Sequence, residues 1–278
     1  MKEIDDNEIR IIGKPTPRSG SWYVRLAWVL VCVVVVVAAL VLWIKTGGSS
    51  EVREGSACDS GVRELPAREG SPADESVIVI DTVVDDVPLT LYMLDCLLPD
   101  CSRASLQLGL PAADSSLLLA VMAADVRADN GDIVGDFVID GRQLARGERK
   151  EGYCAILDGV PLLGRGGKPF LQQALDEEGC FFRQYVLVDE GKALPPKPKG
   201  KNHRRALCRM GHTLFVAASV DRESYHDFAT ALADLWVDEA VALVGSESLL
   251  IYRAEGGLLH TVGSAFDSPN ANFLVWRR

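Results

Sequence analysis

The stretch Gly152–Gly164 reads GYCAILDGVPLLG, and in it two apolar runs flank the dipeptide Asp158-Gly159. An Asp-Gly pair between two strand-like runs indicates a β-hairpin, because both residues readily adopt the backbone geometry of a tight turn. The preceding stretch, DIVGDFVIDG (132–141), ends in the same dipeptide. We therefore expect strands joined by tight turns in this part of the chain.

The segments on either side add two helices and further strands. PFLQQALDEEG (169–179) has helical spacing and closes on Gly179, which is typical of a helix end. In SYHDFATALADLW (224–236), Ser224 is expected to be the N-cap, with Asp227 at the third helical position. The remaining apolar runs indicate strands: SVIVIDTVV (76–84), PLTLYMLDCLL (88–98), SSLLLAVMAADV (115–126), FFRQYVLVDEG (181–191), RALCRM and HTLFVAASV (205–220), VALVG (241–245), LLIYRA (249–254) and NFLVW (272–276). This pattern predicts an α+β domain with a mixed or antiparallel sheet and about two helices.

One N-terminal stretch is too apolar for a globular domain. Residues 26–44, LAWVLVCVVVVVAALVLWI, carry no charge and as a helix would span roughly 28 Å, close to the hydrocarbon thickness of a bilayer. Lys14, Arg18 and Arg25 precede this stretch, so the positive-inside rule predicts a cytoplasmic N-terminus. We expect a tail (1–25), a single transmembrane helix (26–44), a linker rich in Gly, Ser and charge (45–75) and an extracytoplasmic domain (76–278). A retained signal anchor of this kind predicts a single-pass inner-membrane protein with a periplasmic domain.

Charge and cysteine usage limit the classes of partner. The chain has a net charge of -10, which argues against nucleic acid as a ligand, because phosphate backbones need a basic surface. Six cysteines fall in the predicted extracytoplasmic part: Cys58, Cys96, Cys101, Cys154, Cys180 and Cys208. Two interpretations stay open for them. They form disulfides, with Cys96–Cys101 as the first pair to test, or they are free buried thiols.

A cluster of basic residues offers the first candidate site. The segment 192–209 holds seven Lys and Arg residues and no acid, and Arg204 and Arg205 begin an apolar strand within it. An arginine carried by a strand is held in place, and its planar fork suits a phosphate or a carboxylate. The lysines of the same segment are equally consistent with a solvated loop.

A second candidate is the acidic stretch Asp125–Asp132, DVRADNGD, which follows a predicted buried strand. It is consistent with an active-site loop, or with a turn that uses Asp, Asn and Gly for their backbone geometry. Its spacing does not fit the familiar twelve-residue calcium loop, although calcium or another divalent cation stays open as a ligand. No two histidines have the spacing of a helical zinc site, and we predict no metal site and no cofactor.

The order of these segments resembles the phosphodiester glycosidase family, the relatives of the uncovering enzyme that removes N-acetylglucosamine from a phosphodiester, and in particular its Bacteroidetes envelope branch. The resemblance covers residues 76–278. The family's Asn-Gly-Asp motif falls on residues 123–127, where Asp125 matches, and its Pro-Arg-Thr-Ala motif falls on 203–206, where Arg204 replaces the family arginine. Its Val-Asp-Gly-Arg segment falls on 220–222, where Asp221 matches.

The family's Asp-Gly-Gly-Gly-Ser motif falls on Val244–Ser248, and here the sequence departs most. Valine stands in place of the aspartate, and Ser246 and Glu247 replace two glycines. Glycoside cleavage generally uses two carboxyl groups across the scissile bond. The resemblance implies Asp125, Glu247 and Asp221 as catalytic candidates, with Asp129 a further carboxylate nearby.

The substrate-binding candidates are Arg204, Arg205, Arg127, Asn130, Gly245 and Ser246. Two hypotheses follow from the resemblance: a hydrolase of a sugar phosphodiester in an envelope or host glycan, and an inactive relative that binds a glycan or supports the envelope.

Overall fold

The computed structural model describes residues 76–94, 103–246, 248–264 and 268–278. The chain divides into two units, Met1–Leu65 and Pro66–Arg278, and every described residue belongs to the second. Among the described residues, no helix is both long and apolar enough to span a membrane. The predicted tail, transmembrane helix and linker (1–75) lie outside the described residues.

The largest sheet has seven strands in the order β1-β2-β13-β12-β14-β10-β11, and neighbouring strands pair antiparallel. Its strands are β1 (Val77–Val84), β2 (Val87–Leu94), β10 (Val186–Asp189), β11 (Lys192–Ala193), β12 (Arg205–Met210), β13 (Thr213–Ser219) and β14 (Glu239–Leu243). β1 is an edge strand, and its residues Ile78 and Val83 are 44% and 67% exposed. The strands predicted in RALCRM and HTLFVAASV are confirmed as β12 and β13, which pair with each other.

A second sheet of five antiparallel strands has the order β16-β15-β4-β17-β3. Its strands are β3 (Arg103–Leu108), β4 (Leu117–Met122), β15 (Leu249–Arg253), β16 (Leu259–Gly263) and β17 (Asn272–Arg277). Every residue of β4 is buried, because both faces of this central strand are covered. The predicted buried strand is thus confirmed, whereas β3 and β16 were not predicted.

The third sheet contains the hairpins predicted from the two Asp-Gly pairs. Its order is β6-β5-β9-β7-β8, formed by β5 (Phe137–Ile139), β6 (Arg142–Ala145), β7 (Gly152–Leu157), β8 (Val160–Arg165) and β9 (Cys180–Gln184). Asp158 and Gly159 both have positive φ, 47° and 78°, as a two-residue hairpin turn requires. Asp140-Gly141 has the same geometry between β5 and β6.

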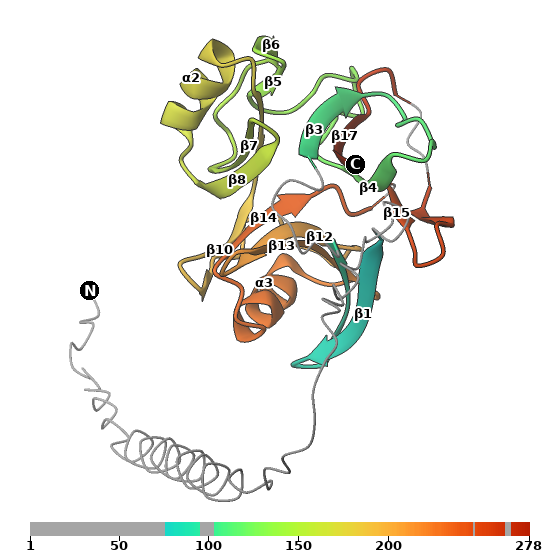
Figure 1. Cartoon of the computed structure of the whole chain (residues 1–278). Helices are drawn as coiled ribbons and strands as arrows, with labels where there is room; N and C mark the ends of the chain where they lie inside the picture. The colour runs from blue at the N-terminus through green and yellow to red at the C-terminus, as the bar shows by residue number, and fades with distance from the viewer. Residues whose placement is uncertain (1–75, 95–102, 247, 265–267) are drawn as a thin grey trace, which may run out of the picture. The chain divides into compact units, whose positions relative to one another are not determined.

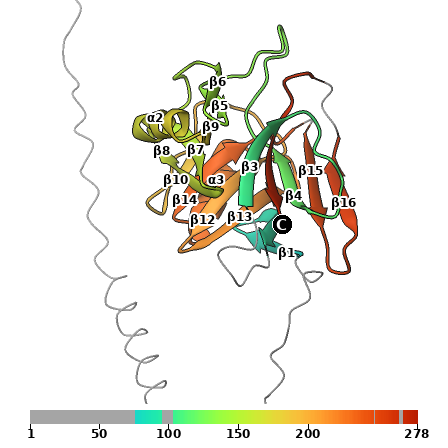
Figure 2. The ribbon, with the colours of Figure 1, turned by 45° about the horizontal axis from the view of Figure 1, so that its top comes forward.

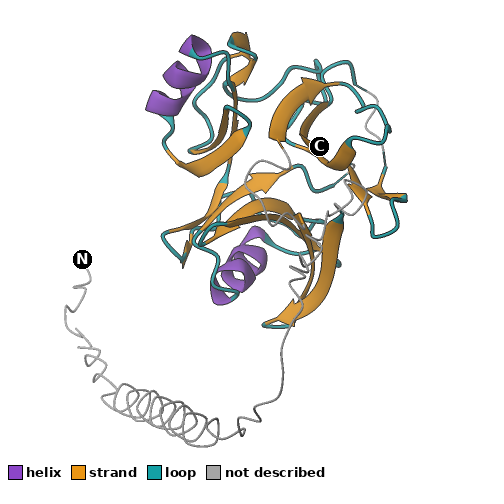
Figure 3. Cartoon of the chain, viewed as in Figure 1, coloured by secondary structure: helices purple, strands orange, loops and turns teal. Residues whose placement is uncertain are grey.

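Two helices complete the described fold, which is therefore α+β and rich in sheet (Figure 3). α2 (Lys168–Asp176) packs on the third sheet, where Ala174 joins a cluster with Tyr153 and Phe181. α3 (Tyr225–Asp234) packs on the seven-stranded sheet (Figure 1). Its predicted cap is confirmed, since the Ser224 hydroxyl accepts a hydrogen bond from the Asp227 amide at 3.0 Å.

A central hydrophobic core joins the three sheets. Figure 2 shows these sheets from a second direction. Val121 of β4, Phe182 of β9 and Val216 of β13 are all buried in this core. Cys154, Cys180 and Cys208 are free and buried, so for these three the thiol interpretation is confirmed. Burial raises the pKa of the Cys154 and Cys208 thiols, which disfavours the reactive thiolate. Cys58, Cys96 and Cys101 lie outside the described residues.

Candidate ligand-binding site

The start of β12 and the end of β14 form the frame of the candidate site. The two strands pair side by side, with Arg205 opposite Leu243. Just beyond, Gly245 lies against the backbone of residues 203 and 204. A Cβ atom at Gly245 would lie 2.1 Å from the carbonyl oxygen of His203, so no larger residue fits without a backbone shift. Gly245, in the turn predicted as a site, therefore lies in close contact with the backbone of Arg204, one of the two predicted arginines.

A cavity of about 610 Å³ opens beside this contact. Its described lining provides three arginines and several hydroxyl groups, and none of the described lining residues is acidic. The polar members are Thr90, Tyr92, Asn202, His203, Arg204, Arg205, Ser219, Arg222, Ser246, Ser248 and Ser264. Positive charge and hydroxyl donors without a competing carboxylate favour an anionic ligand.

Arg205 is the most informative residue of the cavity. Only 6% of it is exposed, and its guanidinium donates to the Ser248 hydroxyl at 2.6 Å and to the Val262 carbonyl at 3.2 Å. Within the described part of the chain, no carboxylate forms an ion pair with it. Burial lowers its pKa, and the nearby Tyr92 hydroxyl opposes that shift. Because a buried charge is normally paired, an anion in the cavity would supply the missing partner.

Two serines of the turn differ in what they offer a ligand. The Ser248 hydroxyl lies 2.7 Å from the Val244 carbonyl and accepts from Arg205, so it serves to orient the guanidinium. The Ser246 hydroxyl oxygen is buried and has no hydrogen-bond partner among the described residues. A buried hydroxyl is normally hydrogen-bonded, and an anion oxygen would satisfy this one.

Arg204 is fixed by three contacts, none of which is an ion pair. Its guanidinium donates to the carbonyls of Glu223 at 2.9 Å and Gly200 at 2.7 Å. It also lies over the Tyr225 ring, 3.7 Å from the centroid. A charge held in this way keeps its attraction for an anion, because no carboxylate among the described residues neutralises it.

An aromatic pair leads from Arg204 to a second group of polar residues. The rings of Tyr225 and Tyr185 meet edge to face at 5.9 Å, and the Lys150 ammonium lies 5.0 Å from the Tyr185 centroid. Burial raises the pKa of Tyr225 to about 12, with Arg204 opposing the shift and Asp125 adding to it. The two adjacent tyrosine rings therefore have a cation on each side, Arg204 beside Tyr225 and Lys150 beside Tyr185.

Asp125 belongs to this second group and does not line the arginine cavity. Its carboxylate accepts from the Lys150 ammonium at 2.5 Å and from the Gln184 amide at 2.9 Å. The Lys150 side chain is 4% exposed, whereas that of Asp125 is 42% exposed. Burial lowers the pKa of Lys150, and Asp125 opposes the shift. The result is an oriented carboxylate that solvent can reach.

The other predicted residues lie elsewhere. Arg127 forms an exposed ion pair with Asp129 at 3.3 Å, and Asn130 donates to Asp132 at 2.8 Å, so the acidic stretch forms a turn stabilised by its own side chains. Asp221 is exposed and is not part of the cavity lining, although Val220 and Arg222 beside it are.

Two further predictions concern carboxylates and metals. Glu247 lies outside the described residues. Among the residues that the structure describes, no three His, Cys, Asp or Glu side chains are grouped closely enough to hold a metal ion.

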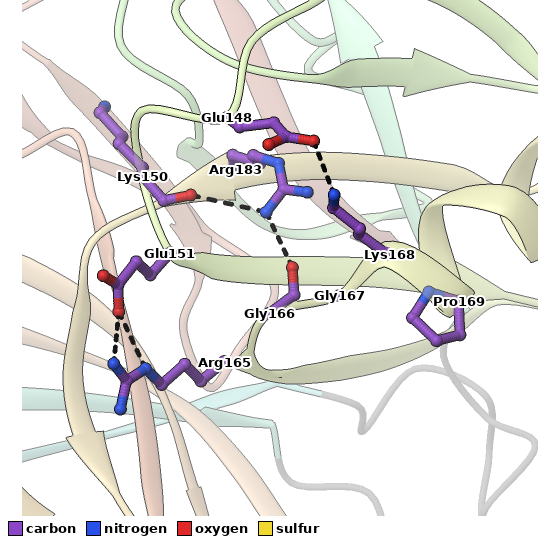
Figure 4. Close-up of a pocket in the computed structure, with 9 residues that line it drawn as sticks. All are labelled: Glu148, Lys150, Glu151, Arg165, Gly166, Gly167, Lys168, Pro169 and Arg183. Atoms are coloured by element: carbon purple, nitrogen blue, oxygen red, sulfur yellow. Dashed lines mark hydrogen bonds and ion pairs between the residues drawn. The ribbon is translucent and has the colours of Figure 1, made fainter.

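A different cavity, of about 520 Å³, lies next to Lys150 and is lined by compensated charges (Figure 4). Glu151 pairs with Arg165 at 2.7 Å, and Glu148 pairs with Lys168 at 3.2 Å. Arg183 donates to the carbonyl of Gly166 at 2.8 Å, and the Lys150 ammonium points away from this contact (Figure 4). Because its charged side chains already form ion pairs or hydrogen bonds, this cavity does not favour the binding of an additional anion.

Comparisons with known proteins support the fold alone. No protein-family model matches the chain, and no curated protein matches it. One similar solved structure is a hypothetical protein from Synechocystis, with a TM-score of 0.52 and 13% identity over 73% of this chain and 62% of that chain.

Another similar structure is the zebrafish N-acetylglucosamine-1-phosphodiester alpha-N-acetylglucosaminidase catalytic domain, auto-inhibited by its pro-peptide. Its TM-score is 0.52 and its identity 14%, over 75% of this chain and 84% of that chain. The chain thus has a fold distantly similar to that of a phosphodiester glycosidase domain.

Proposed function

We propose that this protein binds a sugar phosphodiester of an envelope or host glycan, and that the phosphate occupies the cavity beside Arg205 and Arg204. The observation that carries the proposal is Arg205, a buried guanidinium without a carboxylate partner among the described residues. A phosphate oxygen would receive charge-assisted hydrogen bonds from this fork and from the Ser246 hydroxyl. The fold similarity supports a sugar phosphodiester over other anions.

The proposal includes a place in the cell. Residues 26–44 form the membrane anchor, and Lys14, Arg18 and Arg25 keep the N-terminus in the cytoplasm. The domain that carries the cavity is then periplasmic, where it meets envelope or host glycans. Fusion of a reporter enzyme to the C-terminus tests this placement, since a cytoplasmic reporter signal contradicts it.

Hydrolysis is the second candidate, and the oriented carboxylate of Asp125 favours it. Cleavage between the anomeric carbon and the phosphate oxygen releases a phosphate monoester, whose second pKa is about 6. A leaving group of this acidity departs without the proton that an ordinary glycoside needs from a second carboxyl group. Asp125 would act as the base for an attacking water, and Arg205 would hold the departing phosphate. The position of Asp125 outside the cavity lining favours binding over hydrolysis.

The decisive experiment for the binding proposal measures affinity. N-acetylglucosamine 1-phosphate is titrated into the full-length protein in detergent, and calorimetry measures the affinity. The proteins compared are the wild type, Arg205→Met and the control Arg142→Gln. We expect Arg205→Met to lose at least about tenfold in affinity, since a hydrogen bond to a charged group contributes about 1.5–3 kcal/mol. Equal affinity of the wild type and Arg205→Met contradicts the proposal.

Release of N-acetylglucosamine from its methyl phosphodiester tests hydrolysis separately. Binding without release leaves the binding function alone, whereas release that Asp125→Asn abolishes supports the enzyme.

A further inference from the structure

A groove of about 720 Å³, separate from the arginine cavity, is lined in part by Tyr185. The segment Leu194–Pro198, which contains three prolines, forms one part of its lining, and Tyr185 and Arg149 are also part of the lining. The Leu194 amide donates to the Leu187 carbonyl at 2.7 Å, which fixes the start of the segment. Its shape is therefore set in advance, because proline rings restrict the backbone.

Tyr185 connects this groove to the arginine cavity. It lines the groove, and its ring lies 5.9 Å from the ring of Tyr225. Tyr225 in turn contacts Arg204, which lines the cavity. The groove and the arginine cavity are therefore linked by a chain of direct contacts through these two rings.

The groove also carries unpaired positive charge. Arg149 and Lys197 are exposed, and no described carboxylate pairs with either. Arg165, by contrast, is neutralised by Glu151 at 2.7 Å. The whole chain has a net charge of -10, so this local excess is not a general property of the protein. It favours a ligand with a negative charge at this end as well.

We infer that the groove is a subsite for an anionic oligosaccharide, which extends from the phosphate-bearing sugar in the arginine cavity. The flat faces of Tyr185 and the prolines accept the C–H faces of sugar rings, and Arg149 and Lys197 bind an acidic substituent such as a uronate. This inference rests on the proposed function and adds to it that the ligand is an acidic oligosaccharide, not a single phosphorylated sugar.

The test compares a short and a long probe with the same reducing end. The short probe is N-acetylglucosamine 1-phosphate, and the long probe is a hyaluronan trisaccharide 1-phosphate, which carries one glucuronate. We expect the wild-type full chain to bind the long probe about tenfold more tightly, which corresponds to about 1.4 kcal/mol. The double variant Arg149→Gln/Lys197→Gln should lose this gain and bind the short probe as the wild type does, and Arg142→Gln should change neither affinity.

The outcomes separate the inference from the proposed function. If Arg205→Met weakens binding of the short probe but the wild type binds both probes with equal affinity, the subsite is overturned and the phosphate cavity stands. If Arg149→Gln/Lys197→Gln weakens binding of both probes equally, the groove does not act as an extension, and the inference is again wrong.

Further arms cover the remaining cases. If neither phosphate probe binds, the proposed function fails, and the unphosphorylated trisaccharide then tests the groove alone through its dependence on Arg149 and Lys197. A poly-glutamate peptide that binds the groove more tightly than the trisaccharide overturns the glycan assignment.

Discussion

Arg183 and Arg205 are both buried, at 3% and 6% exposure, but they differ in whether a carboxylate lies beside them. Arg183 pairs with Asp136 at 2.6 Å and also donates to the backbone of Gly166. Arg205 has a hydroxyl and a carbonyl as partners, and no carboxylate among the described residues. A buried arginine that is paired with a carboxylate supports the fold, whereas one without a counter-charge can bind an anion. Burial alone would not have distinguished the two.

The largest effect is expected from breaking the satisfied pair. Asp136→Asn leaves the Arg183 guanidinium buried without its counter-charge, so the free energy of unfolding should fall by about 3–5 kcal/mol. Urea denaturation followed by circular dichroism measures the change. Asp129→Asn, which breaks the exposed Arg127 pair, is the matched control and should cost less than about 1 kcal/mol. Similar losses in both variants would contradict the structural role of Arg183.

An intermediate effect concerns the ring beneath Arg204. The pKa of Tyr225 is raised to about 12 from an ordinary 10, so its neutral form is favoured in the folded state. The contribution of this shift to the free energy of unfolding is fully present below pH 10. It is lost as the pH rises from 10 to 12, because the unfolded chain releases the Tyr225 proton at a lower pH than the folded protein does.

Replacing this hydroxyl group tests the shift directly. Over the same range the wild type should lose about 2 kcal/mol more than Tyr225→Phe, which has no proton to release. Parallel stability–pH curves for the two proteins would show that the ring is not shielded as described.

The smallest effect on stability is expected at the unsatisfied arginine. Arg205→Met removes a buried charge without leaving a carboxylate behind among the described residues, so the free energy of unfolding should change by less than about 1 kcal/mol. Added phosphate should raise the melting temperature of the wild type and leave the variant unchanged, since only a bound ligand stabilises the folded state. A loss as large as that in Asp136→Asn would place Arg205 with Arg183 as a structural residue.

Local chemistry explains which parts of the fold the sequence predicts. The Asp140-Gly141 and Asp158-Gly159 turns and the Ser224 cap depend on neighbours within a few residues, and all three are confirmed. β16 was missed because four of its five residues are exposed and it depends on pairing with β15. β3 was missed although its buried residues alternate, because polar side chains separate them in the sequence RASLQL and no apolar run marks the strand.

The candidate site shows the same division. Arg204, Arg205, Gly245 and Ser246 were predicted together, and they line one cavity, although their role in binding stays a prediction. Lys150, Gln184, Tyr185 and Tyr225 were missed, because they come from separate elements and have no shared motif. Asp125 was singled out from the sequence, but only the structure shows that it pairs with Lys150 and does not line the arginine cavity.

The edge strand β1 has a consequence for handling the protein. One side of β1 pairs with β2, and the described residues offer no partner on the other side. The strand reads VIVIDTVV, with exposed aliphatic residues and neither proline nor lysine, the residues that commonly protect sheet edges from aggregation. Asp81 is its only charged residue. Concentrated samples are therefore expected to aggregate through this edge.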